Sequence, residues 1–171
     1  MIRIVVNDDL AQAIHRATRR ERGVILLPET SPLTPLLSLD AVGADFFIGE
    51  AYYAHYAYGI RRYRANGDEK PEGATRWAPA RTMPDWAART RFRVTAVWRE
   101  PMNQIDAELA ARAGLPKSTE DPRLLLQCWW PKWHGQNWPT TGSSLQACVA
   151  ALTSVLHQDT RLEAPASSKG A

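Results

Sequence analysis

The hydrophobic positions in the first 30 residues predict a strand, a helix and a second strand. Residues 2–6 are mostly β-branched, which favours a short strand. Asn7 and the two aspartates after it offer capping oxygens for a helix that begins near Leu10 and ends at Gly23. Apolar side chains recur in that segment at helical spacing, at Leu10, Ala13, Ile14 and Ala17. The apolar run 24–27 then predicts a second strand.

The middle of the chain predicts further strands separated by irregular segments. Residues 45–49 form a short apolar run, and residues 61–65 lead into an Asn-Gly turn that is typical of hairpins. The polar, proline-interrupted stretch 68–84 predicts a long loop. Residues 91–100 alternate, which predicts a half-buried strand. Its expected apolar face is Phe92, Val94, Ala96 and Trp98, and its expected polar face is Arg91, Arg93, Thr95 and Arg99.

The last third of the chain predicts three helices. Residues 104–113 and 121–130 read as short helices, the second with an aspartate cap and a proline in its first turn. Residues 143–157 carry the strongest amphipathic pattern in the chain. Its apolar positions are Leu145, Cys148, Val149, Leu152, Val155 and Leu156.

The length of 171 residues suits one domain with an appendage. We expect a domain over residues 1–139, an added C-terminal amphipathic helix within residues 140–160, and a disordered tail at residues 161–171. The composition, 44% hydrophobic and 23% charged, is that of a globular protein in water. No apolar run is long enough to span a membrane, and the N-terminal segment does not resemble a signal peptide, so a cytoplasmic protein without a membrane partner is expected.

Basic residues are grouped in two parts of a chain whose net charge is +3. Nine lie between residues 61 and 93 against four acids, and a second group lies at residues 16–22. Cations with aromatic side chains between them suit nucleic-acid binding, although a solvated basic face and packed tryptophans are the plain alternative. The candidate nucleic-acid-binding residues are Arg16, Arg19, Arg20, Arg61, Arg62, Arg81, Arg89, Tyr52, Tyr53, Trp77 and Trp86.

No cofactor or metal is expected from the sequence. The four histidines do not pair with each other or with cysteine at the spacing of metal ligands. The two cysteines, Cys128 and Cys148, lie in apolar surroundings and are interpreted as free thiols.

Several motifs in residues 43–114 resemble those of the ASCH domains of phage and prophage proteins. A Tyr-Arg-Ala-Asn-Gly turn begins at Tyr63, a Met-Pro-Asp-Trp-Ala segment begins at Met83, and a Val-Thr-Ala-Val strand begins at Val94. Upstream, the segment from Gly43 to Tyr52 resembles the family strand that ends in a glutamate and an aromatic residue. The short helix expected at residues 104–113 comes next, in the family's order.

The resemblance implies an α+β fold: a small PUA-like mixed or antiparallel β-barrel with flanking helices, to which this chain adds its C-terminal helix. It also implies binding of RNA, nucleotides or modified nucleosides. Some relatives hydrolyse an acyl-amide on cytidine with a lysine, a threonine and a glutamate, and some cut RNA. Glu50 matches the glutamate and Thr18 is the nearest hydroxyl, but no lysine precedes Lys70. His15 is the remaining candidate base.

Three functions therefore stay open. The leading one is binding of RNA, a nucleotide or a modified nucleoside, with Glu50 and the tyrosines after it lining the pocket. The second is an amidohydrolase acting on an acylated cytidine, or a ribonuclease. The third is a phage inhibitor that binds a host defence protein, with the C-terminal helix as a docking element or a homodimer contact. For Glu50 the structural alternative is a buried carboxylate paired with an arginine such as Arg62 or Arg81.

Overall fold

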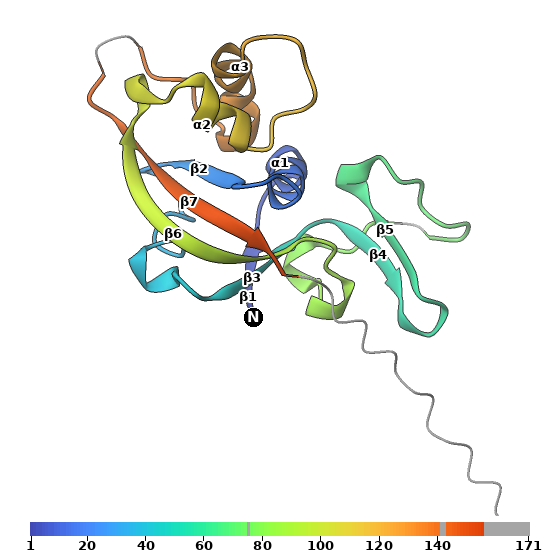
Figure 1. Cartoon of the computed structure of the whole chain (residues 1–171). Coiled ribbons are helices and arrows are strands. Elements are labelled where there is room, and N and C mark those ends of the chain that lie inside the picture. Colours follow the sequence, from blue (N-terminus) through green and yellow to red (C-terminus); the bar gives the residue numbers. More distant parts are fainter. Residues whose placement is uncertain (75, 141–142, 156–171) are drawn as a thin grey trace, which may run out of the picture.

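The computed structural model describes residues 1–74, 76–140 and 143–155. A strongly curved five-stranded sheet carries three helices, and a two-stranded hairpin projects beside it (Figure 1). The strands are β1 (Ile2–Val5), β2 (Val24–Pro28), β3 (Asp45–Gly49), β4 (Tyr52–His55), β5 (Ile60–Tyr63), β6 (Arg91–Pro101) and β7 (Gln146–Ser154), and the α-helices are α1 (Asp8–Thr18), α2 (Ala107–Arg112) and α3 (Pro122–His134).

The large sheet is mixed and open. Its strand order is β1-β3-β6-β7-β2, with β1 and β3 parallel and every other neighbouring pair antiparallel. The α+β class is therefore confirmed. The closed barrel is wrong, because β1 and β2 lie at opposite edges of the sheet and do not pair with each other.

The main core lies between the sheet and the helices. Helix α1 packs against β2, β7 and α3, and α2 packs against α3. Asn7 caps α1, as the sequence predicts, by accepting a hydrogen bond from the Leu10 amide at 2.9 Å. The rings of Phe46 and Phe92 stack at 5.6 Å inside this core, and Trp130 is almost fully buried in it.

The predicted C-terminal helix is wrong. The segment Gln146–Ser154 forms β7, which lies between β6 and β2 in the sheet. A strand flanked by two others and covered on both faces needs apolar residues throughout, so Ala147, Cys148, Val149 and Ala150 are all buried. The same short run also satisfies a helical spacing, which is why the pattern misleads. Strand β7 thus belongs to the same sheet as strands from residues 1–139, and residues 156–171 lie outside the described part.

The alternation in β6 is right at its start and fails further along. A β-bulge at Thr95 inserts one extra residue opposite β7, where Val94 pairs with Leu152 and Ala96 with Ala151. Beyond the bulge the strict alternation is lost: Ala96 is exposed, whereas Val97 and the predicted core residue Trp98 both pack against the core.

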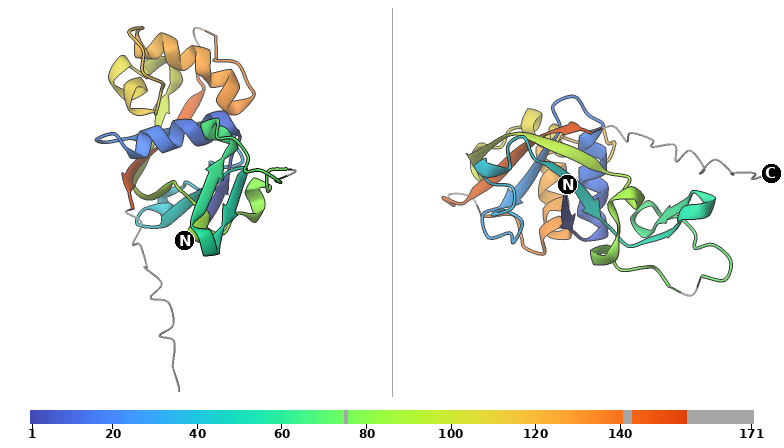
Figure 2. Two further views of the ribbon diagram at one scale, coloured as in Figure 1. Left: turned by 90° about the vertical axis from the view of Figure 1, so that its right-hand side faces the viewer. Right: turned by 90° about the horizontal axis from the view of Figure 1, so that it is seen from below.

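A second apolar cluster fastens the hairpin β4–β5 to the sheet. Phe47 of β3 packs with Tyr63, Met83, Ala87 and Ala88 in this cluster. The Met-Pro-Asp-Trp-Ala segment therefore supplies part of the apolar surface on which the hairpin packs. Figure 2 shows the hairpin standing away from the helices α2 and α3, with α1 between them. No helix in the described ranges is long and apolar enough to cross a membrane.

Candidate functional site

A cavity opens where the parallel strands β1 and β3 end. Its volume is about 490 Å³, and it lies between the residues after β1, the residue Ala51 after β3, and the loop 77–80. Crevices at the carboxyl ends of parallel strands are common binding sites in α/β sheets. The lining residues are Val6, Asn7, Asp8, Ala51, Arg64, Trp77, Ala78, Pro79 and Ala80.

An ion pair forms one wall of this cavity. The Arg64 guanidinium donates from Nε to Asp8 Oδ2 at 2.7 Å and from Nη2 to Asp8 Oδ1 at 3.3 Å. The hydrogen bond to Asp8 raises the pKa of Arg64 above its usual value. Because the pair is exposed, it contributes little to stability, and Asp8 offsets most of the positive charge of Arg64.

Trp77 adds an aromatic side chain to the lining, and two arginines lie near it in the sequence. Trp77 is half-buried, and the backbone of the next residue, Ala78, is bonded in both directions to Tyr52 of the hairpin, at 2.8 and 3.2 Å. Arg76 and Arg81 precede and follow this segment in the chain, and both are exposed. Neither forms an ion pair with any residue that the structure describes.

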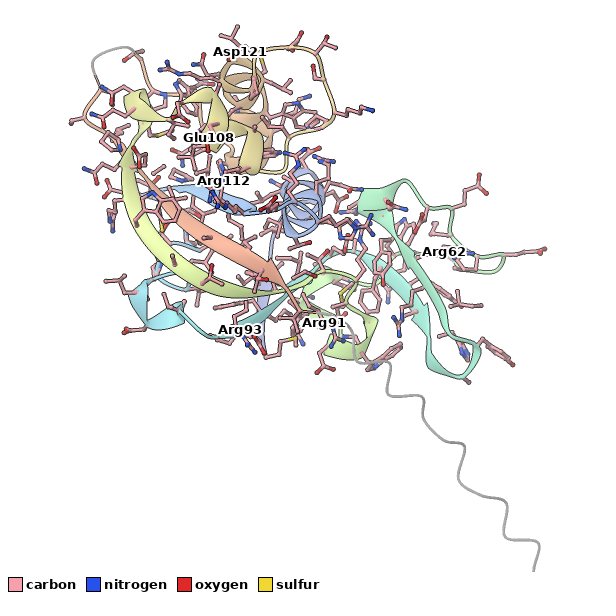
Figure 3. All side chains as sticks on the ribbon, viewed as in Figure 1. Arg62, Arg91, Arg93, Glu108, Arg112 and Asp121 are labelled. Carbon is pink, nitrogen blue, oxygen red and sulfur yellow. The ribbon has the colours of Figure 1, made fainter. Side chains whose placement is uncertain are left out.

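The two faces of the hairpin differ in character. Tyr52 and Tyr63 are cross-strand neighbours that point to the second apolar cluster, where the Tyr52 hydroxyl donates to the Thr82 carbonyl and the Tyr63 hydroxyl to the Ala87 carbonyl. Tyr53 pairs with Arg62 on the other face. Figure 3 shows Arg62 on the hairpin, far from Arg112 on α2.

Glu50 is enclosed and is not among the residues that line this cavity, so its place in a ligand pocket stays a prediction. Its carboxylate is 1% exposed and accepts two hydrogen bonds from Arg89, Nε to Oε1 at 2.8 Å and Nη2 to Oε2 at 2.9 Å. Arg89 also donates to Asn66 Oδ1 at 3.1 Å and lies over the Tyr63 ring at 4.9 Å. Burial raises the pKa of Glu50, and the hydrogen bonds from Arg89 oppose that rise. The alternative of a buried, arginine-paired carboxylate fits this geometry, with Arg89 in place of Arg62 or Arg81.

His15 lies beside this ion pair. Its Nδ1 is 2.8 Å from the hydroxyl of Thr90, a buried residue that no local sequence pattern indicates. Burial, together with the charges of Arg89, Arg19 and Arg16, lowers the pKa of His15 to about 4, so the ring is neutral at pH 7.

The candidate catalytic residues do not converge on a substrate position. The Thr18 hydroxyl donates to the His15 carbonyl of its own helix at 2.9 Å, His15 is bonded to Thr90, and Glu50 is bonded to Arg89. A nucleophile, a base and a charge stabiliser need free atoms that face one reacting centre. Catalysis by Glu50, Thr18 and His15 stays a prediction without geometric support.

Two of the candidate cations serve to join helices. Arg16 donates from Nε to the Gly114 carbonyl at 2.7 Å, and Arg20 donates to the carbonyls of Ala111 and Leu115. Burial lowers the pKa of both arginines, and both are bonded to the segment that ends α2. Arg19 stays exposed.

Two more candidates, Arg61 and Trp86, lie at the hairpin and its base. Arg61 is half-buried opposite Ala54, and Trp86 packs against the second apolar cluster that holds the hairpin. Within the described ranges, no group of three or more histidine, cysteine, aspartate or glutamate residues is placed to hold a metal ion.

Comparison with protein-family models, with curated proteins and with solved structures finds no match to this chain. The ASCH resemblance therefore stays an expectation from the sequence.

Proposed function

We propose that this protein binds single-stranded RNA at the cavity between Arg64 and Trp77 and over the neighbouring basic surface. The observation that carries the proposal is Trp77 in the lining of the cavity, preceded and followed in the chain by two exposed arginines, Arg76 and Arg81, that lack carboxylate partners among the described residues. A flat side chain next to uncompensated cations is the combination that holds a base and its phosphates.

The ion pairs explain which cations are available. Of the basic residues between positions 61 and 93, Arg64, Arg89 and Arg93 are engaged with Asp8, Glu50 and Asp45. Arginines without a carboxylate partner in the described structure are Arg61, Arg62, Arg76, Arg81 and Arg91. Arg91 donates from Nη2 to the Asp85 carbonyl, which leaves Arg61, Arg62, Arg76 and Arg81 as the candidates for phosphate binding. The candidate RNA surface therefore extends from the loop at Trp77 onto the hairpin, which pairs with that loop through Tyr52 and Ala78.

The arginines and Trp77 would contribute to RNA binding in different ways. Arginines without partners attract phosphates without reading sequence, and Trp77 stacks on a base of any kind. Such a surface gives affinity that is strongly salt-dependent and weakly sequence-dependent. Recognition of a free nucleotide or a modified nucleoside would instead need a closed pocket that reads base edges.

Fluorescence anisotropy with a labelled single-stranded RNA tests the proposal. Trp77→Ala removes the stacking surface and should weaken binding by about 1–3 kcal/mol, or roughly 5- to 150-fold. The double variant Arg76→Gln, Arg81→Gln should weaken binding and also reduce its salt dependence.

Lys117→Gln is the matched control, because it removes one exposed positive charge from the loop between α2 and α3. It should leave RNA affinity within about twofold. Equal affinities for wild type and Trp77→Ala, or equal losses for Lys117→Gln and the arginine variants, would refute this binding surface.

A further inference from the structure

A second cavity lies at the other end of the molecule, beside the start of α3. Its volume is about 520 Å³, within the range of small-molecule sites. It belongs to the end that carries α2 and α3, away from the hairpin (Figure 1). The lining residues are Met102, Asn103, Arg123, Gln127, Trp138, Pro139, Thr140 and Ser143.

The charge in this cavity is not compensated. Arg123 is the one ionised side chain of the lining, and it has no carboxylate within ion-pair distance in the described structure. It donates from Nη2 to the Asn103 carbonyl at 3.1 Å, while its Nε is buried without a hydrogen-bond partner. A buried donor of a charged group without a partner is costly, so this guanidinium is suited to an anion.

The acidic residue nearest to Arg123 in the sequence does not fill that role. Asp121 is the N-cap of α3, and its Oδ1 accepts the backbone amides of Arg123 and Leu124 at 2.9 and 3.2 Å. Its carboxylate is thus held at the helix end, and Asp121 does not line the cavity.

The remaining lining suits a planar polar ring. Trp138 is half-buried, and its ring is fixed edge to face on the buried Trp130, with ring centroids 5.2 Å apart and an interplanar angle of 80°. The amides of Asn103 and Gln127 each offer one acceptor and two donors. A tryptophan that is already fixed in orientation stacks on a ligand ring at low entropic cost.

We propose that this cavity binds a small compound that carries a phosphate on a planar heterocycle, of the size of a nucleoside monophosphate. Arg123 holds the phosphate, Trp138 stacks on the ring, and the amides bond to its edge. The site is separate from the RNA surface, and this proposal does not depend on RNA binding.

Isothermal titration calorimetry with uridine 5′-monophosphate, uridine and inorganic phosphate tests this inference. Wild type should bind the monophosphate saturably, and uridine or phosphate alone at least tenfold more weakly. Arg123→Gln should lose at least tenfold in affinity for the monophosphate, and Arg123→Lys should recover part of it. Lys117→Gln should bind as wild type does. Absence of saturable binding to wild type, or equal affinity of Arg123→Gln, would overturn the inference.

Two further readouts separate this site from a folding defect and from the RNA surface. The indole N–H resonance of Trp138, assigned with Trp138→Phe, should shift on addition of the monophosphate in wild type and stay in place in Arg123→Gln. RNA affinity should be kept in Arg123→Gln, and monophosphate affinity should be kept in Trp77→Ala. Loss of both activities in either variant would show that the two sites are not separate and would contradict the assignment.

Discussion

Replacing Arg89 by methionine should destabilise the protein severely, because it leaves the Glu50 carboxylate buried without its cation. Glu50 is 1% exposed and Arg89 13% exposed, and the pair is joined by two hydrogen bonds of 2.8 and 2.9 Å. Removal of one partner from such a pair costs roughly 3–5 kcal/mol. The variant also loses the contacts of Arg89 with Asn66 and Tyr63. Since a domain is stable by about 5–15 kcal/mol in total, the loss is a large fraction of the whole.

Urea unfolding followed by circular dichroism measures this effect. With a slope of about 2 kcal/mol/M, the midpoint should fall by roughly 1.5–2.5 M. Arg93→Met is the matched control, since it breaks the exposed pair with Asp45 and should cost less than about 1 kcal/mol. The double variant Glu50→Gln, Arg89→Met should be less destabilised than the sum of the two single variants. A loss below about 1 kcal/mol in Arg89→Met, or strict additivity in the double variant, would refute the reasoning.

Two further predictions concern histidines and a glycine. Burial lowers the pKa of His15 and of His134 to about 4 from 6.5, so the unfolded chain binds more protons and stability should fall as the pH drops from about 6.5 to about 4. The loss of unfolding free energy should be on the order of 2 kcal/mol per histidine after allowance for partial exposure. Urea unfolding of wild type at pH 7 and at about pH 4.5 measures this loss, and replacing either histidine by glutamine should make it smaller. An unchanged loss in both variants would contradict the assignment. Gly114→Ala should unfold the protein or lower its thermal midpoint steeply, because φ there is +76° and an added Cβ would lie 1.8 Å from the Ala13 carbonyl oxygen. Gly43→Ala, with φ at +87° but open space around it, should cost only about 1 kcal/mol, and similar midpoints for the two variants would show that close packing is not the cause.

Local sequence patterns predict the elements whose signals are local. Capping by Asn7, the apolar stripe of α1 and the short apolar strands β2 and β3 can all be predicted from residues close together in the chain. The same reasoning misassigns β7, because a strand buried on both faces lacks the two-residue alternation that marks a half-buried strand.

Long-range pairing accounts for the rest of what the sequence does not predict. The partner of Glu50 is Arg89, 39 residues away, and nothing in the sequence distinguishes it from the neighbouring arginines. Thr90 carries no local signal, because its hydroxyl gains a partner only where α1 brings His15 to it. Because Gln146–Ser154 is a strand, the helix expected as a docking element or homodimer contact is absent from that segment, and the inhibitor and homodimer hypotheses stay predictions.

The salt dependence of RNA binding tests the central claim most directly. If Arg61, Arg62, Arg76 and Arg81 each neutralise one phosphate, the logarithm of the association constant should fall with the logarithm of salt concentration with a slope of about −2.8. Affinity for a single-stranded RNA should then drop roughly 50-fold between about 50 and 200 mM salt, and the double variant Arg76→Gln, Arg81→Gln should show about half that slope. Absence of binding at about 50 mM salt, or a slope near zero, would contradict the account.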